Sequence, residues 1–223
     1  MDTQKRIIVW FSAALVVIIA AVGAYQVANG PRAELRKTDG TLSTPIDATD
    51  WTKGSKTPKV TFLEYSDFQC PACGAYNPLL EEMYAKYKNV ISFTYRHFPL
   101  PQHPNALPAA YASEAAGAQG KFWEMKDMLF TKQAEWSESK DVATVFEGYA
   151  RELGLDIAKY NVDVVSEATK ARVEANVKSG TLSSINHTPT FFINGKMIEN
   201  PESPEELYAL IDTAIASSTP KTN

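Results

Sequence analysis

Hydrophobic positions along this chain follow three patterns: one long uninterrupted run, several short runs of the β type, and longer stretches with a helical period. The uninterrupted run, Ile7 to Tyr25, has 19 residues without a charge and would span roughly 28 Å as a helix. Because this length matches the hydrocarbon core of a bilayer, residues 1–28 are predicted to form a signal anchor with a transmembrane helix. A cleaved signal peptide is the alternative, since residues 22–24 have small side chains.

Residues 29–57 are rich in Gly, Pro, Thr, Ser and Asp and show no hydrophobic period. This composition predicts a linker that joins the apolar segment to a folded domain. Two basic residues precede the apolar run and three follow it closely. Their distribution therefore does not decide which side of a membrane the domain would occupy.

The predicted domain, residues 58–218, begins with a β-α-β pattern. Residues 60–65 are apolar on both faces, as in a central strand, and residues 90–98 are predicted to form the next strand. A helical stretch at 70–87 separates them, so the two strands are predicted to be parallel. Helical periods then follow at 105–118, 121–132, 141–153 and 165–178.

The C-terminal part contains a hairpin and a last helix. Residues 191–193 and 196–198 flank an Asn194–Gly195 turn, and Ser203 with Glu206 forms a capping box. The whole order predicts an α/β fold with a small mixed sheet, interrupted by an all-helical insertion at about 104–183.

Composition narrows the class of protein. Hydrophobic residues make up 44% and charged residues 22%, which is typical of a folded domain. The formal net charge is −4, so no basic surface is expected that could neutralise phosphates, and nucleic acid is excluded as a partner.

The chain has two cysteines, Cys70 and Cys73, at the start of a predicted helix. Unpaired N–H groups at a helix N-terminus favour a thiolate, so Cys70 is the expected nucleophile, and Pro71 fits the first helical position. Cys73 lies one turn further and is the expected resolving thiol. A structural disulfide and half of a zinc site are the alternatives, although zinc needs more ligands and the chain has three histidines and no second cysteine pair.

Three motifs carry a resemblance to a known family. The segments at 64–73 (EYSDFQCPAC), 120–124 (GKFWE) and 188–195 (TPTFFING) resemble the DsbA-like thioredoxin-fold disulfide oxidoreductases, particularly their membrane-tethered members. The similarity covers about Thr57 to Ala216. It implies a thioredoxin fold with a helical insertion, and thiol–disulfide exchange outside the cytoplasm without a cofactor or metal.

The resemblance also implies partners and roles. Substrates would be cysteine-containing polypeptides, and a membrane quinone-linked partner would reoxidise the enzyme. Cys70 and Cys73 would be the redox pair, Pro189 would be a cis-proline, and the backbone of Thr188 would face an incoming peptide. An oxidase is the expected function. A reductase or isomerase is the alternative within the same chemistry, because direction depends on redox poise. A non-redox tethered binding module and a metal-delivery module are the alternatives from other classes.

Glu64 is a further candidate catalytic residue, and three other residues, Pro71, Ala72 and His187, are candidates for tuning the cysteine pair. Glu64 would be a buried acid beneath Cys73 that accepts its proton, or else a carboxylate that reaches water at the strand edge. Ala72 and Pro71 lie between the cysteines and set the start of the helix. His187 stands where the family more often has glycine, so it is either a solvated loop residue or a cation that acts on Cys70.

Overall fold

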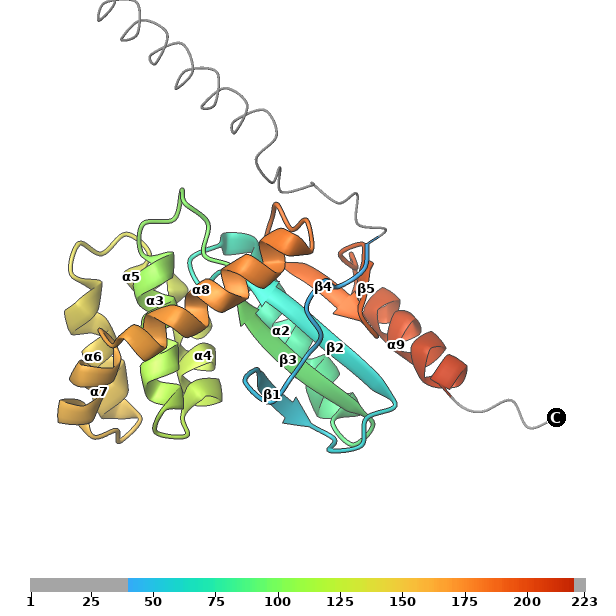
Figure 1. Cartoon of the computed structure of the whole chain (residues 1–223), viewed down its shortest axis with the longest axis horizontal. Helices are drawn as coiled ribbons and strands as arrows, with labels where there is room; N and C mark the ends of the chain where they lie inside the picture. The colour runs from blue at the N-terminus through green and yellow to red at the C-terminus, as the bar shows by residue number, and fades with distance from the viewer. Residues whose placement is uncertain (1–39, 219–223) are drawn as a thin grey trace, which may run out of the picture. The chain divides into compact units, whose positions relative to one another are not determined.

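The computed structural model describes residues 40–218 (Figure 1). The predicted anchor at 1–28 lies outside the described residues. Between residues 40 and 218, no helix is both long and apolar enough to cross a membrane.

One five-stranded sheet organises the domain, in the order β1-β3-β2-β4-β5. The strands are β1 (Trp51–Gly54), β2 (Val60–Ser66), β3 (Ile91–His97), β4 (Thr190–Ile193) and β5 (Lys196–Ile198). Strands β2 and β3 are parallel, as the β-α-β pattern predicts, and α2 (Pro71–Tyr87) connects them. The other three pairings are antiparallel, including the predicted hairpin of β4 and β5.

The two faces of the sheet pack against different helices. Phe62, Phe93 and Phe191 share a core cluster with α2 and with the last helix, α9 (Pro204–Ser218). Side chains of β2 and β4 on the opposite face pack near α8 (Glu167–Leu182) and the N-terminal segment. Both faces are thus covered, which explains why β2 is buried along nearly its whole length.

The predicted helical insertion follows β3 and ends at α8. Its helices are α3 (Ala106–Gly117), α4 (Phe122–Thr131), α5 (Gln133–Trp136), α6 (Val142–Glu152), α7 (Ile157–Asp163) and α8. They gather at one end of the sheet, and α8 returns along it (Figure 1). The short helices α5 and α7 were not expected, because segments of four and seven residues are too short to show a helical period.

The last helix begins at the predicted cap. Ser203 Oγ accepts a hydrogen bond from the N–H of Glu206 at 3.2 Å. The Glu206 carboxylate accepts from the N–H of Glu202 rather than from Ser203. Both contacts satisfy free N–H groups near the helix start.

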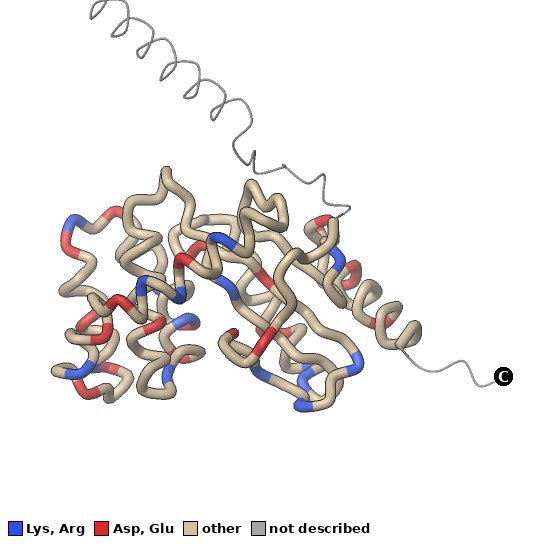
Figure 2. The backbone as a smooth tube through the Cα atoms, viewed as in Figure 1, with Lys and Arg blue, Asp and Glu red and all other residues tan. Residues whose placement is uncertain are grey.

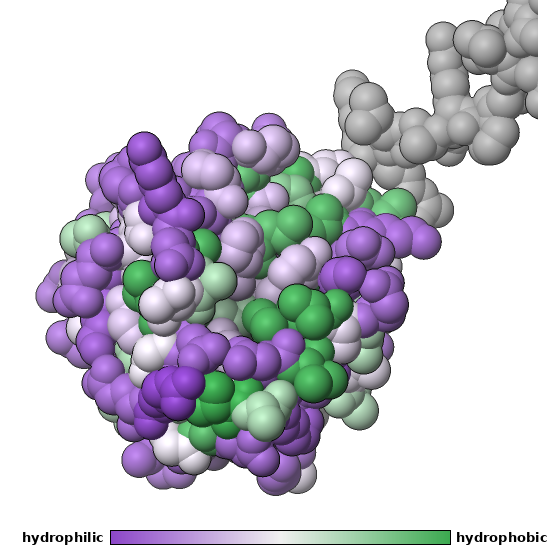
Figure 3. Space-filling view, turned by 90° about the vertical axis from the view of Figure 1, so that its left-hand side faces the viewer, coloured by the Kyte–Doolittle hydropathy of each residue, from purple (hydrophilic) through white to green (hydrophobic). Residues whose placement is uncertain are grey.

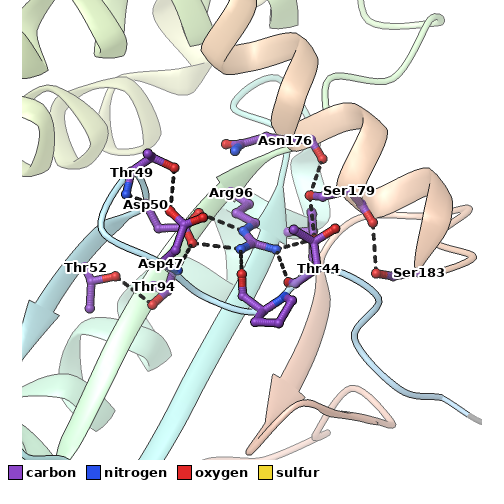
Figure 4. Close-up of polar contacts among 12 residues, drawn as sticks. Thr44, Asp47, Thr49, Asp50, Thr52, Thr94, Arg96, Asn176, Ser179 and Ser183 are labelled. Carbon is purple, nitrogen blue, oxygen red and sulfur yellow. Dashed lines mark hydrogen bonds and ion pairs between the residues drawn. The ribbon is translucent and has the colours of Figure 1, made fainter.

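The predicted linker at 29–57 is wrong for its described part. Residues 51–54 form β1 and pair with β3, and Thr41 forms a bridge with Lys196. The guanidinium of Arg96, on β3, binds this segment. It donates to both carboxylate oxygens of Asp50 at 2.7 Å and to the carbonyl oxygens of Thr44 and Pro45 (Figure 4). The linker prediction failed because this contact joins positions 46 residues apart, which composition does not reveal.

The surface of the domain carries charges of both signs and some apolar hollows. Figure 2 shows basic and acidic residues interspersed over the insertion and the sheet. Apolar side chains interrupt the polar surface at the insertion end (Figure 3). One pocket of about 400 Å³ there is lined by α3, α6 and α7, and none of its lining residues comes from the loops around the cysteines.

Candidate active site

The two cysteines lie at the start of α2, as the sequence predicts. Cys70 is the N-cap residue, Pro71 opens the helix, and the N–H of Cys70 donates to the carbonyl of Asp67 at 3.1 Å. Cys70 is 7% exposed, whereas Cys73 is fully buried. The first thiol is thus the one nearer to solvent. Pro71 and Ala72 are both exposed, so the backbone between the cysteines lies at the surface.

The two thiols have opposite electrostatic environments. A hydrogen bond from the Cys73 thiol lowers the pKa of Cys70 to about 5, with smaller contributions from the Thr188 side chain and from the backbone N–H groups of Cys73 and Ala72. Burial raises the pKa of Cys73 well above its usual value, and the neighbouring Cys70 and Glu64 raise it further. At neutral pH the pair therefore holds one thiolate, on Cys70, and one thiol, on Cys73.

Alkylation of the reduced protein at pH 6 tests this difference. Cys70 is expected to react many times faster than Cys73, because only the thiolate is nucleophilic and only Cys70 is both ionised and near solvent. Peptide mapping by mass spectrometry reads the label at each site. Faster labelling of Cys73 would reverse the assigned roles.

The loop that contains Thr188 and Pro189, distant in sequence, lies against Cys70. The Thr188–Pro189 peptide bond is cis, as the resemblance implies. Cys70 Sγ lies 3.4 Å from the carbonyl oxygen of Thr188, although the residues are 118 positions apart. The hydroxyl of Thr188 is buried and has no other partner within residues 40–218, so it is available to a thiolate on Cys70.

Glu64 is buried, which excludes the alternative of a carboxylate that reaches water. It is 1% exposed, and neither of its oxygens has a hydrogen-bond partner within residues 40–218. Burial raises the pKa of Glu64 to about 7, and the positive charge of Lys126 acts against that change. Because the Glu64 charge acts on Cys73, the carboxyl is close enough to influence that thiol. A carboxyl that titrates near neutrality is suited to exchange a proton there.

A buried lysine near Glu64 was not expected from the sequence. Lys126 on α4 is fully buried and donates to Asn77 Oδ1 at 2.6 Å and to Glu81 Oε1 at 3.0 Å. The signal was present in the helical period, since Lys126 follows Phe122 by four positions and falls on the same buried face. A charged residue on an apolar face points to a buried ion pair.

His187 is an exposed residue at the start of the cis-proline turn. Its Nδ1 lies 3.1 Å from the carbonyl oxygen of Pro189 and 3.4 Å from Thr190 Oγ1. These contacts hold the ring against its own loop. An effect of His187 on Cys70 stays a prediction.

No group of three or more potential metal ligands occurs within residues 40–218. The three histidines lie in separate environments: the ring of His97 contacts Glu114, the ring of His103 contacts Asp67, and the ring of His187 contacts its own turn. The described site is thus a cysteine pair with a buried acid and a cis-proline loop.

Comparison with known proteins identifies the family. The sequence profile described as Thioredoxin matches residues 47–213, which is most of the chain. The chain belongs to the thioredoxin family. Among solved structures, BdbD from Bacillus subtilis in its oxidised form has a similar fold, with a TM-score of 0.70 and 20% identity, over 80% of this chain and 99% of BdbD.

Other solved structures confirm the DsbA-like fold. The α-DsbA1 protein of Wolbachia pipientis has a TM-score of 0.70 and 19% identity, over 79% of this chain and 96% of that protein. The predicted thioredoxin fold with a helical insertion is therefore confirmed.

Relatives with more than 30% sequence identity are named as Na⁺/H⁺ antiporters, not as oxidoreductases. The Na⁺/H⁺ antiporter NhaA 1 of Salinispora arenicola is 37% identical over 179 residues, which are 79% of this chain and 26% of that protein. The corresponding antiporter of Mycolicibacterium gilvum is 38% identical over 177 residues, covering 28% of its length. The chain spans only about a quarter of the curated relatives that it matches.

Proposed function

We propose that this protein is a thiol–disulfide oxidoreductase that oxidises cysteine-containing polypeptides through Cys70 and Cys73. The observation that carries the proposal is the difference between the two thiols: the pKa of Cys70 is lowered to about 5, while Cys73 is buried and held protonated. A stabilised thiolate stabilises the reduced pair. The disulfide form is then a stronger oxidant.

The first step of the proposed reaction takes place at Cys70. A substrate thiolate attacks Cys70 Sγ, a mixed disulfide forms, and the Cys70–Cys73 bond breaks with its electron pair on Cys73 Sγ. Glu64 lies near Cys73, and in its neutral form it can supply the proton that this sulfur needs.

In the second step, another thiolate of the substrate attacks the substrate sulfur of the mixed disulfide. The substrate disulfide forms, and Cys70 leaves as a thiolate, which its low pKa favours. Two electrons have then moved from the substrate to the cysteine pair. We propose that the backbone of Thr188, whose carbonyl oxygen lies 3.4 Å from Cys70 Sγ, pairs with an extended substrate peptide.

The reduced pair must pass its electrons to an oxidant before the next cycle. For this step we propose a membrane quinone-linked partner, and for the domain a location outside the cytoplasm, anchored by the apolar segment at 7–25. The antiporter names of the curated relatives describe much longer proteins, so we assign no ion transport to this chain.

The reduction potential of the pair distinguishes an oxidase from a reductase. We expect a potential above about −200 mV when the protein is equilibrated with glutathione buffers, because disulfide-forming members of the fold lie in that range. Acid quenching followed by alkylation measures the fractions of the oxidised and reduced forms at equilibrium. A potential near about −270 mV would favour the reductase alternative.

A further inference from the structure

The helical insertion contacts the cysteine loop through one amide side chain. Gln133, the first residue of α5, donates from Nε2 to the carbonyl oxygen of Phe68 at 2.7 Å and to that of Cys70 at 2.9 Å. A glutamine Nε2 carries two N–H groups, so both are used on the backbone that leads into α2. The contact spans 63 residues of sequence to Cys70.

Gly74, the residue after Cys73, leaves room for this side chain. A Cβ atom built on Gly74 would lie 2.6 Å from Gln133 Oε1 and 3.1 Å from Gln133 Cδ. Real Cβ atoms do not approach so closely, so any side chain at position 74 would displace Gln133. The two positions are therefore coupled.

Two neighbouring amide side chains also bind backbone carbonyl groups in this region. Gln69 donates from Nε2 to the carbonyl oxygen of Ser137 at 2.8 Å, and Asn105 Nδ2 donates to the carbonyl oxygens of Ser137 and Ser139 at 3.0 Å. Of these three amide side chains, Gln133 is the one that donates to the carbonyl of Cys70 itself. That carbonyl also accepts the N–H of Gly74 at 3.1 Å, at the first turn of α2.

This geometry links Gln133 to the reactive sulfur. The N–H groups of Ala72 and Cys73 stabilise the Cys70 thiolate, and they point toward it only while the first turn of α2 keeps its position. Fixing the carbonyls on either side of Gln69 holds that turn in place. An amide on the insertion is thus in a position to control the thiolate from outside the thioredoxin core.

We propose that Gln133 is a positioning residue through which the helical insertion sets the reactivity of Cys70. The inference deepens the proposed function and rests on it. It predicts that changes at position 133 act on the cysteine pair without any contact between residue 133 and the substrate.

The test is the ultraviolet titration of the thiolate in the reduced protein. Gln133→Ala is expected to raise the titration midpoint of Cys70 by about one pH unit, which is a roughly tenfold smaller ratio of thiolate to thiol at a given acidic pH. The potential should then become more reducing, by about 30 mV for a tenfold change in the equilibrium constant.

Gln119→Ala is the matched control. Gln119 also bridges backbone groups with its amide, since it donates to the carbonyl and accepts from the N–H of Asp156, but it does so within the insertion and away from Cys70. Its titration should equal that of the wild type. Equal changes in both variants would mean a general loosening of the fold and would overturn the proposal.

Gly74→Ala is a second way to remove the contact between Gln133 and the Cys70 carbonyl, and it serves if Gln133→Ala folds poorly. It should displace Gln133 and move the titration midpoint in the same direction. In the double variant Gly74→Ala/Gln133→Ala the midpoint should equal that of Gln133→Ala alone, because the side chain to be displaced is gone.

Additive effects in the double variant, or a wild-type titration in both single variants, would refute the role of Gln133. These titrations use no substrate. A failure here is therefore distinct from a failure of the proposed function, which the wild-type potential tests.

Discussion

Replacing Cys73 with alanine is expected to abolish turnover and to leave Cys70 in mixed disulfides with substrate polypeptides. Without the resolving thiol, Cys70 can still attack a disulfide but no internal thiol releases the adduct. We expect turnover to fall by roughly a thousandfold or more, as when one member of a group that acts as a unit is removed. Non-reducing electrophoresis and mass spectrometry of the variant expressed in cells measure the adducts.

Cys70→Ala is the matched control for this experiment. It should be equally inactive but should trap nothing, because the remaining thiol, Cys73, is fully buried and its pKa is raised by burial. Adducts on Cys73 in that variant would show that the assigned order of attack is wrong. An absence of adducts on Cys70 in Cys73→Ala would contradict covalent exchange with polypeptides.

Replacing Glu64 with glutamine is expected to change how stability depends on pH. Burial raises the pKa of this carboxyl from 4.5 to about 7, so the folded state favours its neutral form. The associated stability is fully present below about pH 4.5 and is lost as the pH rises through 7. The loss amounts to about 3 kcal/mol, because a tenfold difference in proton affinity between the folded and unfolded states corresponds to roughly 1.4 kcal/mol.

Glutamine stays neutral and lacks this dependence. The difference in unfolding free energy between the variant and the wild type should therefore move by about 3 kcal/mol in favour of the variant between pH 4 and pH 8. Denaturant unfolding of the reduced protein across that range measures it. Glu82→Gln, at an exposed position of α2, is the control and should leave the profile unchanged.

Glu64→Gln should also slow the step in which Cys73 gains or loses its proton. Removing a positioned acid or base costs roughly 100-fold or more. Stopped-flow measurement of mixed-disulfide formation between the oxidised protein and a thiol peptide should show this loss together with the disappearance of the rate change near pH 7. A wild-type rate and pH profile would rule out proton exchange through Glu64.

Much of the fold could be predicted because its core elements carry their own periodicity. Strands β2 and β3, helix α2 and the hairpin of β4 and β5 lie within one or two residues of their predicted bounds. The position of the cysteine pair at a helix start follows from the same local pattern, with proline at the first helical position. Local sequence signals were sufficient there.

The parts that could not be predicted depend on contacts between distant residues. Strand β1 and the segment before it show no hydrophobic period, and long-range contacts, among them the ion pair of Arg96 on β3 with Asp50, hold them on the sheet. Lys126 was missed because a lysine is expected at the surface. The amide of Gln133 was missed because α5 is short and its contact with Cys70 spans 63 residues. Such contacts exist only once the chain has folded.

Transfer of a disulfide to a reduced dithiol peptide tests the central claim most directly. The oxidised protein is mixed with the peptide, and the thiols on both molecules are assigned by alkylation and mass spectrometry. We predict that the peptide loses both thiols while free thiols appear on Cys70 and Cys73 together, and that Cys70→Ser transfers nothing. A peptide that stays reduced while the Cys70–Cys73 disulfide remains intact would contradict this account.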